Sequence, residues 1–140
     1  MAFAIYPSLF FTVALLVTTA YFLMGGLPLL VLDHDTGLDA RFVRGFFNVY
    51  YRAAMVTASG AALSYALWGR FTFAIGALAL VALALLLRRQ LLASMARLGE
   101  RIQAADAAAI RGFRRVHGLA LAANAAQLVL IVWGVLRLSL

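Results

Sequence analysis

The chain has 140 residues, of which 66% are hydrophobic and only 12% are charged. Soluble globular domains average roughly 45–50% apolar and about 25% charged residues, so an ordinary water-soluble domain is excluded, and the apolar content also excludes disorder. The absence of cysteine excludes disulfides, thiolate metal sites and cysteine nucleophiles. The cationic residues are 12 arginines, and the net charge is +7. In a membrane chain such residues mark topology and headgroup contacts rather than nucleic-acid binding. We therefore expect one integral membrane domain over residues 1–140.

Four uncharged apolar segments predict four membrane-spanning helices, because one crossing takes about 20 residues. The segments are Ser8–Leu32, Ala53–Gly69, Phe71–Leu87 and Gly118–Leu136. The first lacks a basic leader region and a small-residue cleavage site, so we expect a retained helix rather than a signal peptide. Only one charged residue, Arg70, separates the second segment from the third, which predicts a tight helical hairpin there.

The residues before the second span predict that helix two starts at the membrane interface. Asp39 is a candidate N-cap, so this helix should begin near Ala40. Its aromatic rings should lie at the membrane boundary, and its arginines should lie at headgroup depth. The rings are those of Phe46, Phe47, Tyr50 and Tyr51, and the arginines are Arg41, Arg44 and Arg52.

The residues between the third and fourth spans predict that helix three continues past the bilayer. Its helical period persists through Leu91, Met95, Leu98 and Ile102. The predicted turn is Gln103–Asp106, with Asp106 capping helix four. The fold class is therefore all-α: a four-helix transmembrane bundle with helices two, three and four extended on the cytoplasmic side.

The arginines are distributed unevenly between the two ends of such a bundle. Ten fall in the first and third connections, and only Arg70 and Arg137 fall on the side of the chain ends. Short loops rich in arginine stay in the cytoplasm. We therefore expect a multi-pass protein of the bacterial inner membrane with both termini in the periplasm.

Three polar residues of the fourth span, His117, Asn124 and Gln127, share one helix face at i, i+7 and i+10. Polar groups at such depth face protein rather than lipid. They predict either a polar track or ligand pocket, or interhelical hydrogen bonds, which in membranes average roughly 0.6 kcal/mol each. We favour the structural alternative.

The two histidines raise the question of a metal or haem. Asp33, His34 and Asp35 adjoin one another in sequence, and together with His117 they are weak candidates for a divalent metal site. Two histidines could also ligate a haem iron. We favour a simpler alternative, in which the aspartates pair with arginines and His34 is a solvated turn residue, so no cofactor is predicted.

Small residues recur at helical spacing in the second and fourth spans. They are Ala53, Thr57, Gly60, Ala61 and Ser64 in one, and Gly118, Ala122 and Ala126 in the other. Small faces allow helices to approach closely in lipid. We expect tight packing of helices two and four; the alternative is a docking face for another subunit.

No constellation in the sequence predicts catalysis. The chain has no Ser–His–Asp arrangement, no glycine-rich phosphate loop and no zinc-protease motif, so we assign no catalytic residue. We expect a non-catalytic accessory or scaffold subunit that contacts anionic lipid headgroups and associates with other membrane subunits or with itself. The headgroup or partner contacts would be Arg41, Arg44, Arg52, Arg111, Arg114 and Arg115. The alternatives are a small-solute or ion transporter that uses the polar track and, less favoured, a haem or metal redox protein.

Two segments resemble a widespread family of uncharacterised bacterial four-helix membrane proteins related to eukaryotic transmembrane protein 205. They are Phe42–Tyr51, with its paired tyrosines, and Gly112–Leu119, with its Phe-Arg-Arg-x-His pattern, followed by Asn124. The similarity extends over most of the chain after about Leu32. The resemblance implies a four-helix fold and supplies no catalytic residues.

Overall fold

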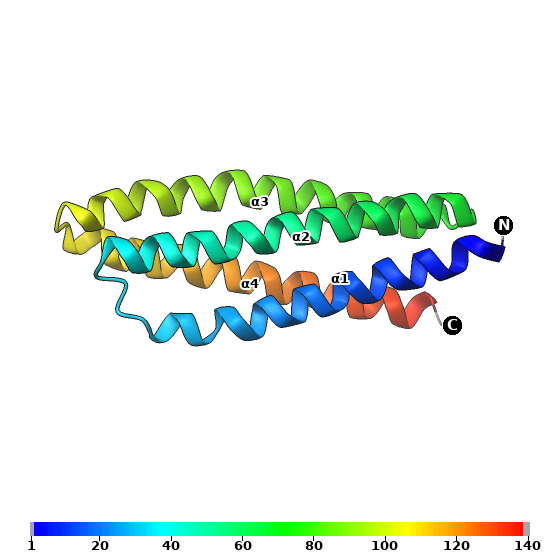
Figure 1. Cartoon of the computed structure of the whole chain (residues 1–140), viewed down its shortest axis with the longest axis horizontal. Helices are drawn as coiled ribbons and strands as arrows, with labels where there is room; N and C mark the ends of the chain where they lie inside the picture. Colours follow the sequence, from blue (N-terminus) through cyan, green and yellow to red (C-terminus); the bar gives the residue numbers. More distant parts are fainter. Residues whose placement is uncertain (1, 139–140) are drawn as a thin grey trace.

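The structure, a computed structural model, describes residues 2–138, which form four long helices arranged antiparallel (Figure 1). They are α1 (Ile5–Gly26), α2 (Gly37–Trp68), α3 (Phe71–Gln103) and α4 (Ala107–Leu138), with short 3-10 turns η1 (Ala2–Ala4) and η2 (Pro28–Val31). The described residues contain no β-strand. The predicted all-α four-helix bundle is therefore confirmed.

Among residues 2–138, three stretches are long and apolar enough to cross a membrane: Ile5–Val31, Phe71–Gln103 and Ala107–Leu138. Only 17%, 17% and 28% of their most apolar windows are buried inside the bundle. Most of the apolar surface therefore faces outward, an arrangement that lipid stabilises and water does not. The helix α2 is less apolar than the other three and is absent from this set. It lies alongside α1 and α3 over the length of the bundle (Figure 1).

The helix ends follow local signals in the sequence. Gly69 ends α2 in the left-handed conformation, with φ at +80°, which glycine adopts without steric cost, so the predicted hairpin is confirmed. The turn after Gln103 is also confirmed, because Asp106 Oδ1 accepts a hydrogen bond from the Ala108 N–H at 3.0 Å. The predicted start of α2 is wrong. Thr36 is the N-cap and its hydroxyl accepts from the Asp39 N–H at 3.2 Å, while Asp39 stabilises the positive end of the helix dipole.

The helices pack as a ring in which α2 lies against α1 and α3, and α4 lies against the same two helices. The expected tight packing of helices two and four is therefore wrong, because these two lie diagonally across the bundle. Gly60 of α2 faces the ring of Phe11 in α1, whereas a Cβ atom at Gly118 of α4 would meet nothing within 4 Å. Ala122 and Ala126 are exposed, so this small-residue stripe of α4 faces outward.

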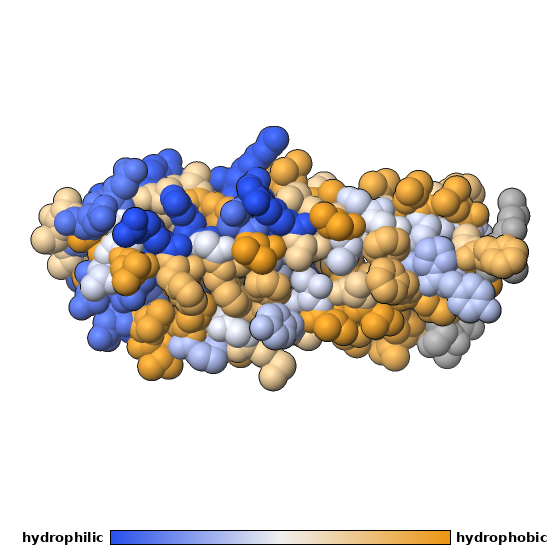
Figure 2. All heavy atoms as spheres, viewed as in Figure 1, coloured by the Kyte–Doolittle hydropathy of each residue, from blue (hydrophilic) through white to orange (hydrophobic). Residues whose placement is uncertain are grey.

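The two ends of the bundle differ in polarity. The two chain ends and the α2–α3 turn lie together, and the other connections, residues 27–36 and 104–106, lie at the opposite end (Figure 1). Hydrophilic residues gather at that opposite end (Figure 2), which we call the basic end because ten of the arginines lie toward it. The 33 residues of α3 span roughly 50 Å, well beyond the hydrocarbon thickness of about 30 Å. At the other end, the guanidinium of Arg70 lies over the ring of Trp68, 5.1 Å from its centre. The guanidinium of Arg137 lies over the ring of Trp133 in the same way, at 5.4 Å.

Candidate functional site

The polar residues predicted on one face of helix four all point into the bundle. His117, Asn124 and Gln127 are at most 4% exposed, within a helix whose opposite face is open. Sequence spacing therefore identified the inward face of α4. What the spacing did not show is the set of partners that these side chains meet on α1, α2 and the α1–α2 link.

His117 forms a buried pair with His34. His34 Nε2 lies 3.1 Å from His117 Nδ1, and His117 Nε2 lies 3.2 Å from the backbone oxygen of Gly26. A carbonyl oxygen only accepts, so His117 Nε2 carries the proton and its Nδ1 accepts from the Nε2–H of His34. The two rings thus form a directed chain that ends on the carbonyl at the C-terminus of α1.

The Gly26 carbonyl is available because α1 tightens into a 3-10 turn at this point. The Leu30 N–H, which would reach Gly26 in a continuing α-helix, bonds to Leu27 instead. The last carbonyls of a helix need partners from outside the helix. His117 supplies one, so α4 fixes the point where α1 ends and the link to α2 begins.

The expectation that His34 is a solvated turn residue is wrong. The residue lies in the link before α2, yet it is 0% exposed, and its ring is 5.5 Å from that of Phe113. Its backbone is left-handed, with φ at 55°, a conformation that costs a non-glycine residue about 1–3 kcal/mol. The pairing with His117 and the burial of the ring hold it there.

The histidine pair does not fit the metal or haem sites considered from sequence. Asp33 and Asp35 are exposed while His34 is buried, so the three residues do not converge. No group of three or more potential ligands occurs among residues 2–138. The two imidazoles bond directly to each other at 3.1 Å, which leaves no room for a porphyrin between them.

Deeper in the bundle, Tyr50 joins the other two polar residues of α4. Its hydroxyl donates to Gln127 Oε1 at 2.6 Å. In the orientation that satisfies both ends of the Asn124 carboxamide, its nitrogen donates to Tyr50 Oη and to the Thr19 carbonyl, both at 3.2 Å. The carboxamide oxygen accepts from the Leu23 N–H at 3.3 Å. Three helices are therefore joined through Asn124, and its hydrogen-bonding groups are used within the bundle.

Tyr50 and Tyr51, expected at the depth of the membrane boundary, turn into the bundle instead of toward lipid or solvent. Both are 1% exposed, and Phe47 one turn earlier is fully buried. A signal for this face was present in the sequence. Val43, Phe47, Tyr50, Ala54 and Ala58 recur at three- and four-residue intervals, the period of a helix face that packs inward.

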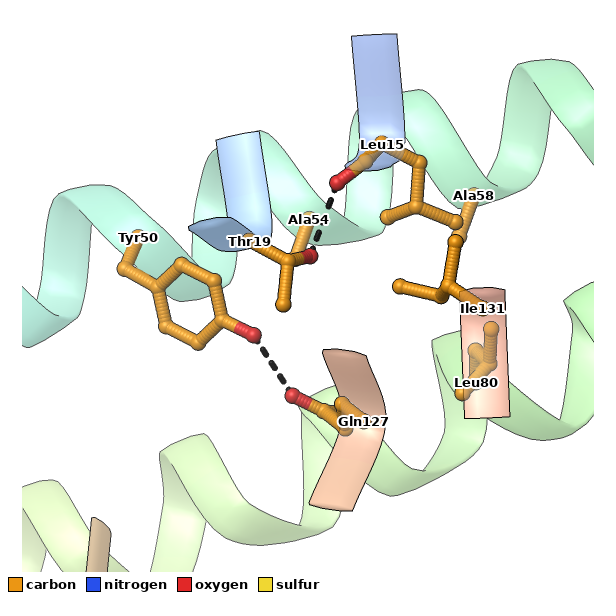
Figure 3. A pocket seen from close by; sticks show the side chains of 8 residues that line it. All are labelled: Leu15, Thr19, Tyr50, Ala54, Ala58, Leu80, Gln127 and Ile131. Atoms are coloured by element: carbon orange, nitrogen blue, oxygen red, sulfur yellow. Dashed lines mark hydrogen bonds between the residues drawn. The ribbon is translucent and has the colours of Figure 1, made fainter. Parts of the chain in front are cut away.

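A small cavity lies beside the Tyr50–Gln127 bond (Figure 3). Its volume is about 10 Å³, and its walls come from all four helices. A single water molecule needs roughly 10–15 Å³, so the space is at the lower limit for one water. Two buried polar atoms of the described residues have no hydrogen-bond partner, namely His34 Nδ1 and Tyr51 Oη.

The six arginines predicted as headgroup or partner contacts are all exposed. Five lie in the parts of α2 and α4 near the basic end, whereas Arg52 lies midway along α2. Arg114 reaches the Leu32 backbone oxygen at 3.4 Å, which ties α4 to the α1–α2 link. Between α2 and α3, Arg88 Nε donates to Asn48 Oδ1 at 3.1 Å. Sequence reasoning did not single out Arg88, because its partner is 40 residues away.

Burial makes the stability of the fold sensitive to acid through His34. Loss of hydration is the largest effect and lowers the pKa of His34 below 6.5. The Leu32 backbone raises the pKa in part, nearby Arg114 lowers it again, and Asp39 and Asp33 raise it slightly. Well above pH 6.5 the residue is neutral in both the folded and the unfolded state. Below that value the unfolded chain takes up a proton that folded His34 resists, so we expect the free energy of unfolding to fall as the pH falls.

Unfolding in detergent, followed by circular dichroism across this range, would measure the loss. The acid-induced loss in the free energy of unfolding should be smaller in His34→Asn, because asparagine does not titrate and tolerates the left-handed backbone. An equal acid-induced loss in the variant would assign it to other groups.

No family model, curated protein or solved structure matches the chain. The resemblance based on residues 42–51 and 112–119 therefore stays a prediction. The structure does bring these two segments together, since the rings of Phe47 and His117 are 5.5 Å apart.

Proposed function

We propose that this protein is a non-catalytic subunit or scaffold of the bacterial inner membrane, which associates with anionic lipids and with further membrane subunits or itself. The observation that carries the proposal is the closure of the polar core. The side chains of His117, Asn124 and Gln127 are occupied by internal hydrogen bonds, and the cavity beside them is about 10 Å³. The chemistry left available is on the surface: arginines at the basic end, and an outward stripe of small residues on α4.

The basic end is assigned to the cytoplasm on the strength of its charge. Arginine-rich connections resist translocation, and the ten arginines toward this end contrast with two at the other. Both termini are then periplasmic. Reporter fusions at the C-terminus test the assignment, and a reporter active only in the cytoplasm would overturn it.

Association is tested by native mass spectrometry after extraction in mild detergent. We expect copurified phospholipid together with either a second copy or another membrane protein. The outward stripe of Gly118, Ala122 and Ala126 would let a partner helix approach closely, so Ala122→Leu should weaken the association. A strictly solitary monomer would contradict the proposal, whether or not lipid copurifies with it.

A transporter that uses the polar track is the second candidate, favoured by the polar residues buried within a spanning helix. The scaffold proposal predicts no solute pathway through one bundle, because these groups are occupied by internal partners. Asn124→Leu should therefore leave liposome flux of ions and small solutes at the background of empty vesicles, as in the unaltered protein. Flux in the unaltered protein that Asn124→Leu abolishes, with the bundle still folded, would establish the transporter instead.

A further inference from the structure

A groove runs between α2 and α3 at the basic end. It consists of two adjoining hollows of about 210 and 390 Å³. Arg41 and Arg44 line both hollows, so these two residues lie where the hollows adjoin. The groove is open because small residues, among them Gly45 and Ala93, line it where the helices would otherwise fill the space.

The depth of the groove matches the headgroup layer. Trp68 marks the interface at the far end of α2, and Arg44 lies 24 positions before it, or roughly 36 Å along the helix. The hydrocarbon core is about 30 Å thick. The guanidinium of Arg44 therefore lies just beyond the hydrocarbon, where lipid phosphates are found, in keeping with the membrane placement proposed above.

A third arginine stands at the membrane side of the groove. Arg88 of α3 is half-buried, and Asn48, which lines the larger hollow, accepts a hydrogen bond from its Nε at 3.1 Å. This bond orients the remaining N–H groups of Arg88 and leaves them able to donate. The acidic side chain of the groove, Glu100, lies on the wall of the smaller hollow only, so the balance of charge is positive.

We infer that this groove binds the phosphodiester headgroup of an anionic phospholipid. Planar guanidinium groups recognise phosphate oxygens through paired hydrogen bonds, and basic hollows between helices at the cytoplasmic face hold anionic headgroups. The apolar part of the lining, including Leu92, suits the glycerol and the first carbons of the lipid. The inference rests on the proposed membrane orientation, and it specifies which of the surface arginines hold lipid.

The test uses the full-length protein in nanodiscs and follows exchange of a fluorescent phosphatidylglycerol. Arg41→Gln/Arg44→Gln removes two charges from the groove, and Arg89→Gln/Arg97→Gln removes two exposed charges of α3 outside its lining. We expect the groove variant to bind phosphatidylglycerol about 30-fold more weakly, from the attraction of each arginine near a charged surface. The control variant should weaken binding of phosphatidylglycerol by less than about threefold.

A neutral variant separates shape from charge. A Cβ atom at Gly45 would meet nothing within 4 Å, so Gly45→Leu should fold normally while filling the larger hollow. It should also weaken binding of phosphatidylglycerol, although no charge is lost. Excess inorganic phosphate should not displace the phosphatidylglycerol. With phosphatidylcholine as the only lipid, the exchange of lipid should be the same whether or not Arg41 and Arg44 are replaced.

The outcomes separate this inference from the broader proposal. Equal weakening by both double variants, or undiminished binding in Gly45→Leu, would overturn the groove and leave a diffuse basic surface. Displacement by inorganic phosphate would replace the lipid with a soluble phosphate ligand. Failure of the scaffold proposal would appear separately, as a protein that binds phosphatidylglycerol yet copurifies without a partner or second copy.

Discussion

Replacing His117 by alanine should lower the free energy of unfolding by about 3 kcal/mol. The change removes the donor to the Gly26 carbonyl and the acceptor for the His34 Nε2–H, both in a site that is 0% exposed. A buried polar group left without a partner costs about 1–3 kcal/mol, and the missing ring adds the penalty of a cavity. Hydrogen bonds between membrane helices average only about 0.6 kcal/mol. We therefore expect a loss near the lower end of the combined cost of the two unpartnered groups and the cavity.

Reversible unfolding in mixed micelles would measure this loss. The matched control is Leu119→Ala, two residues away on the exposed face of the same helix, where the side chain is 56% exposed. His117→Phe keeps a ring in the site without hydrogen bonds and should fall between the control and His117→Ala. Equal stability of His117→Ala and Leu119→Ala would show that the pair does not hold the fold together.

The histidine pair also predicts where the damage should appear. His117 fixes the end of α1 through Gly26, and His34 belongs to the link that leads into α2. Amide hydrogen exchange in residues 27–36 should therefore rise in His117→Ala before the rest of the bundle is affected. A uniform rise over all four helices would instead indicate global destabilisation.

Much of the fold was predictable because its signals are local. Four apolar segments predicted the four long helices, and the charge at Arg70 next to Gly69 located the α2–α3 hairpin. The carboxylate of Asp106 likewise located the start of α4. Each of these features depends on residues within a few positions of one another, and that is the range over which capping and helix period operate.

Only the residues that α4 contributes to the polar core were predictable from the sequence. The spacing of His117, Asn124 and Gln127 revealed the inward face of α4, but Tyr50 is 77 residues from Gln127, and His34 is 83 residues from His117. Such pairings arise from packing and leave no local pattern. A histidine between two aspartates looks solvated in sequence, and only the closure of the bundle over the α1–α2 link buries it.

The order of helices around the bundle could not be deduced from small residues alone. Gly60 and Gly118 are both small residues of predicted spans, yet the structure gives them opposite surroundings. A side chain at Gly60 would overlap the Phe11 ring of α1, whereas one at Gly118 would extend into open space. A small residue indicates that close approach is allowed, without identifying the helix that approaches.

The opposite surroundings of Gly60 and Gly118 predict different effects when each glycine is enlarged. Gly60→Leu should lower the free energy of unfolding by about 3 kcal/mol, the upper part of the usual range for overpacking a well-filled contact, because α1 must move away from α2. Gly118→Leu makes the same chemical change in a spanning helix with no neighbour to displace, so its stability should stay within about 1 kcal/mol of the unaltered protein. The alanine variants at both positions should follow the same order with smaller losses.

The free energies of unfolding of the leucine and alanine variants at Gly60 and Gly118, measured in the same detergent, would test this expected order. Phe11→Ala adds a further control, because removing the ring makes room at Gly60, and the double variant Phe11→Ala/Gly60→Leu should recover part of the loss. That recovery would place α1 against α2 at this depth. If Gly118→Leu proved the more damaging change, a tight contact at Gly118 would be indicated, and the diagonal placement of α2 and α4 would be wrong.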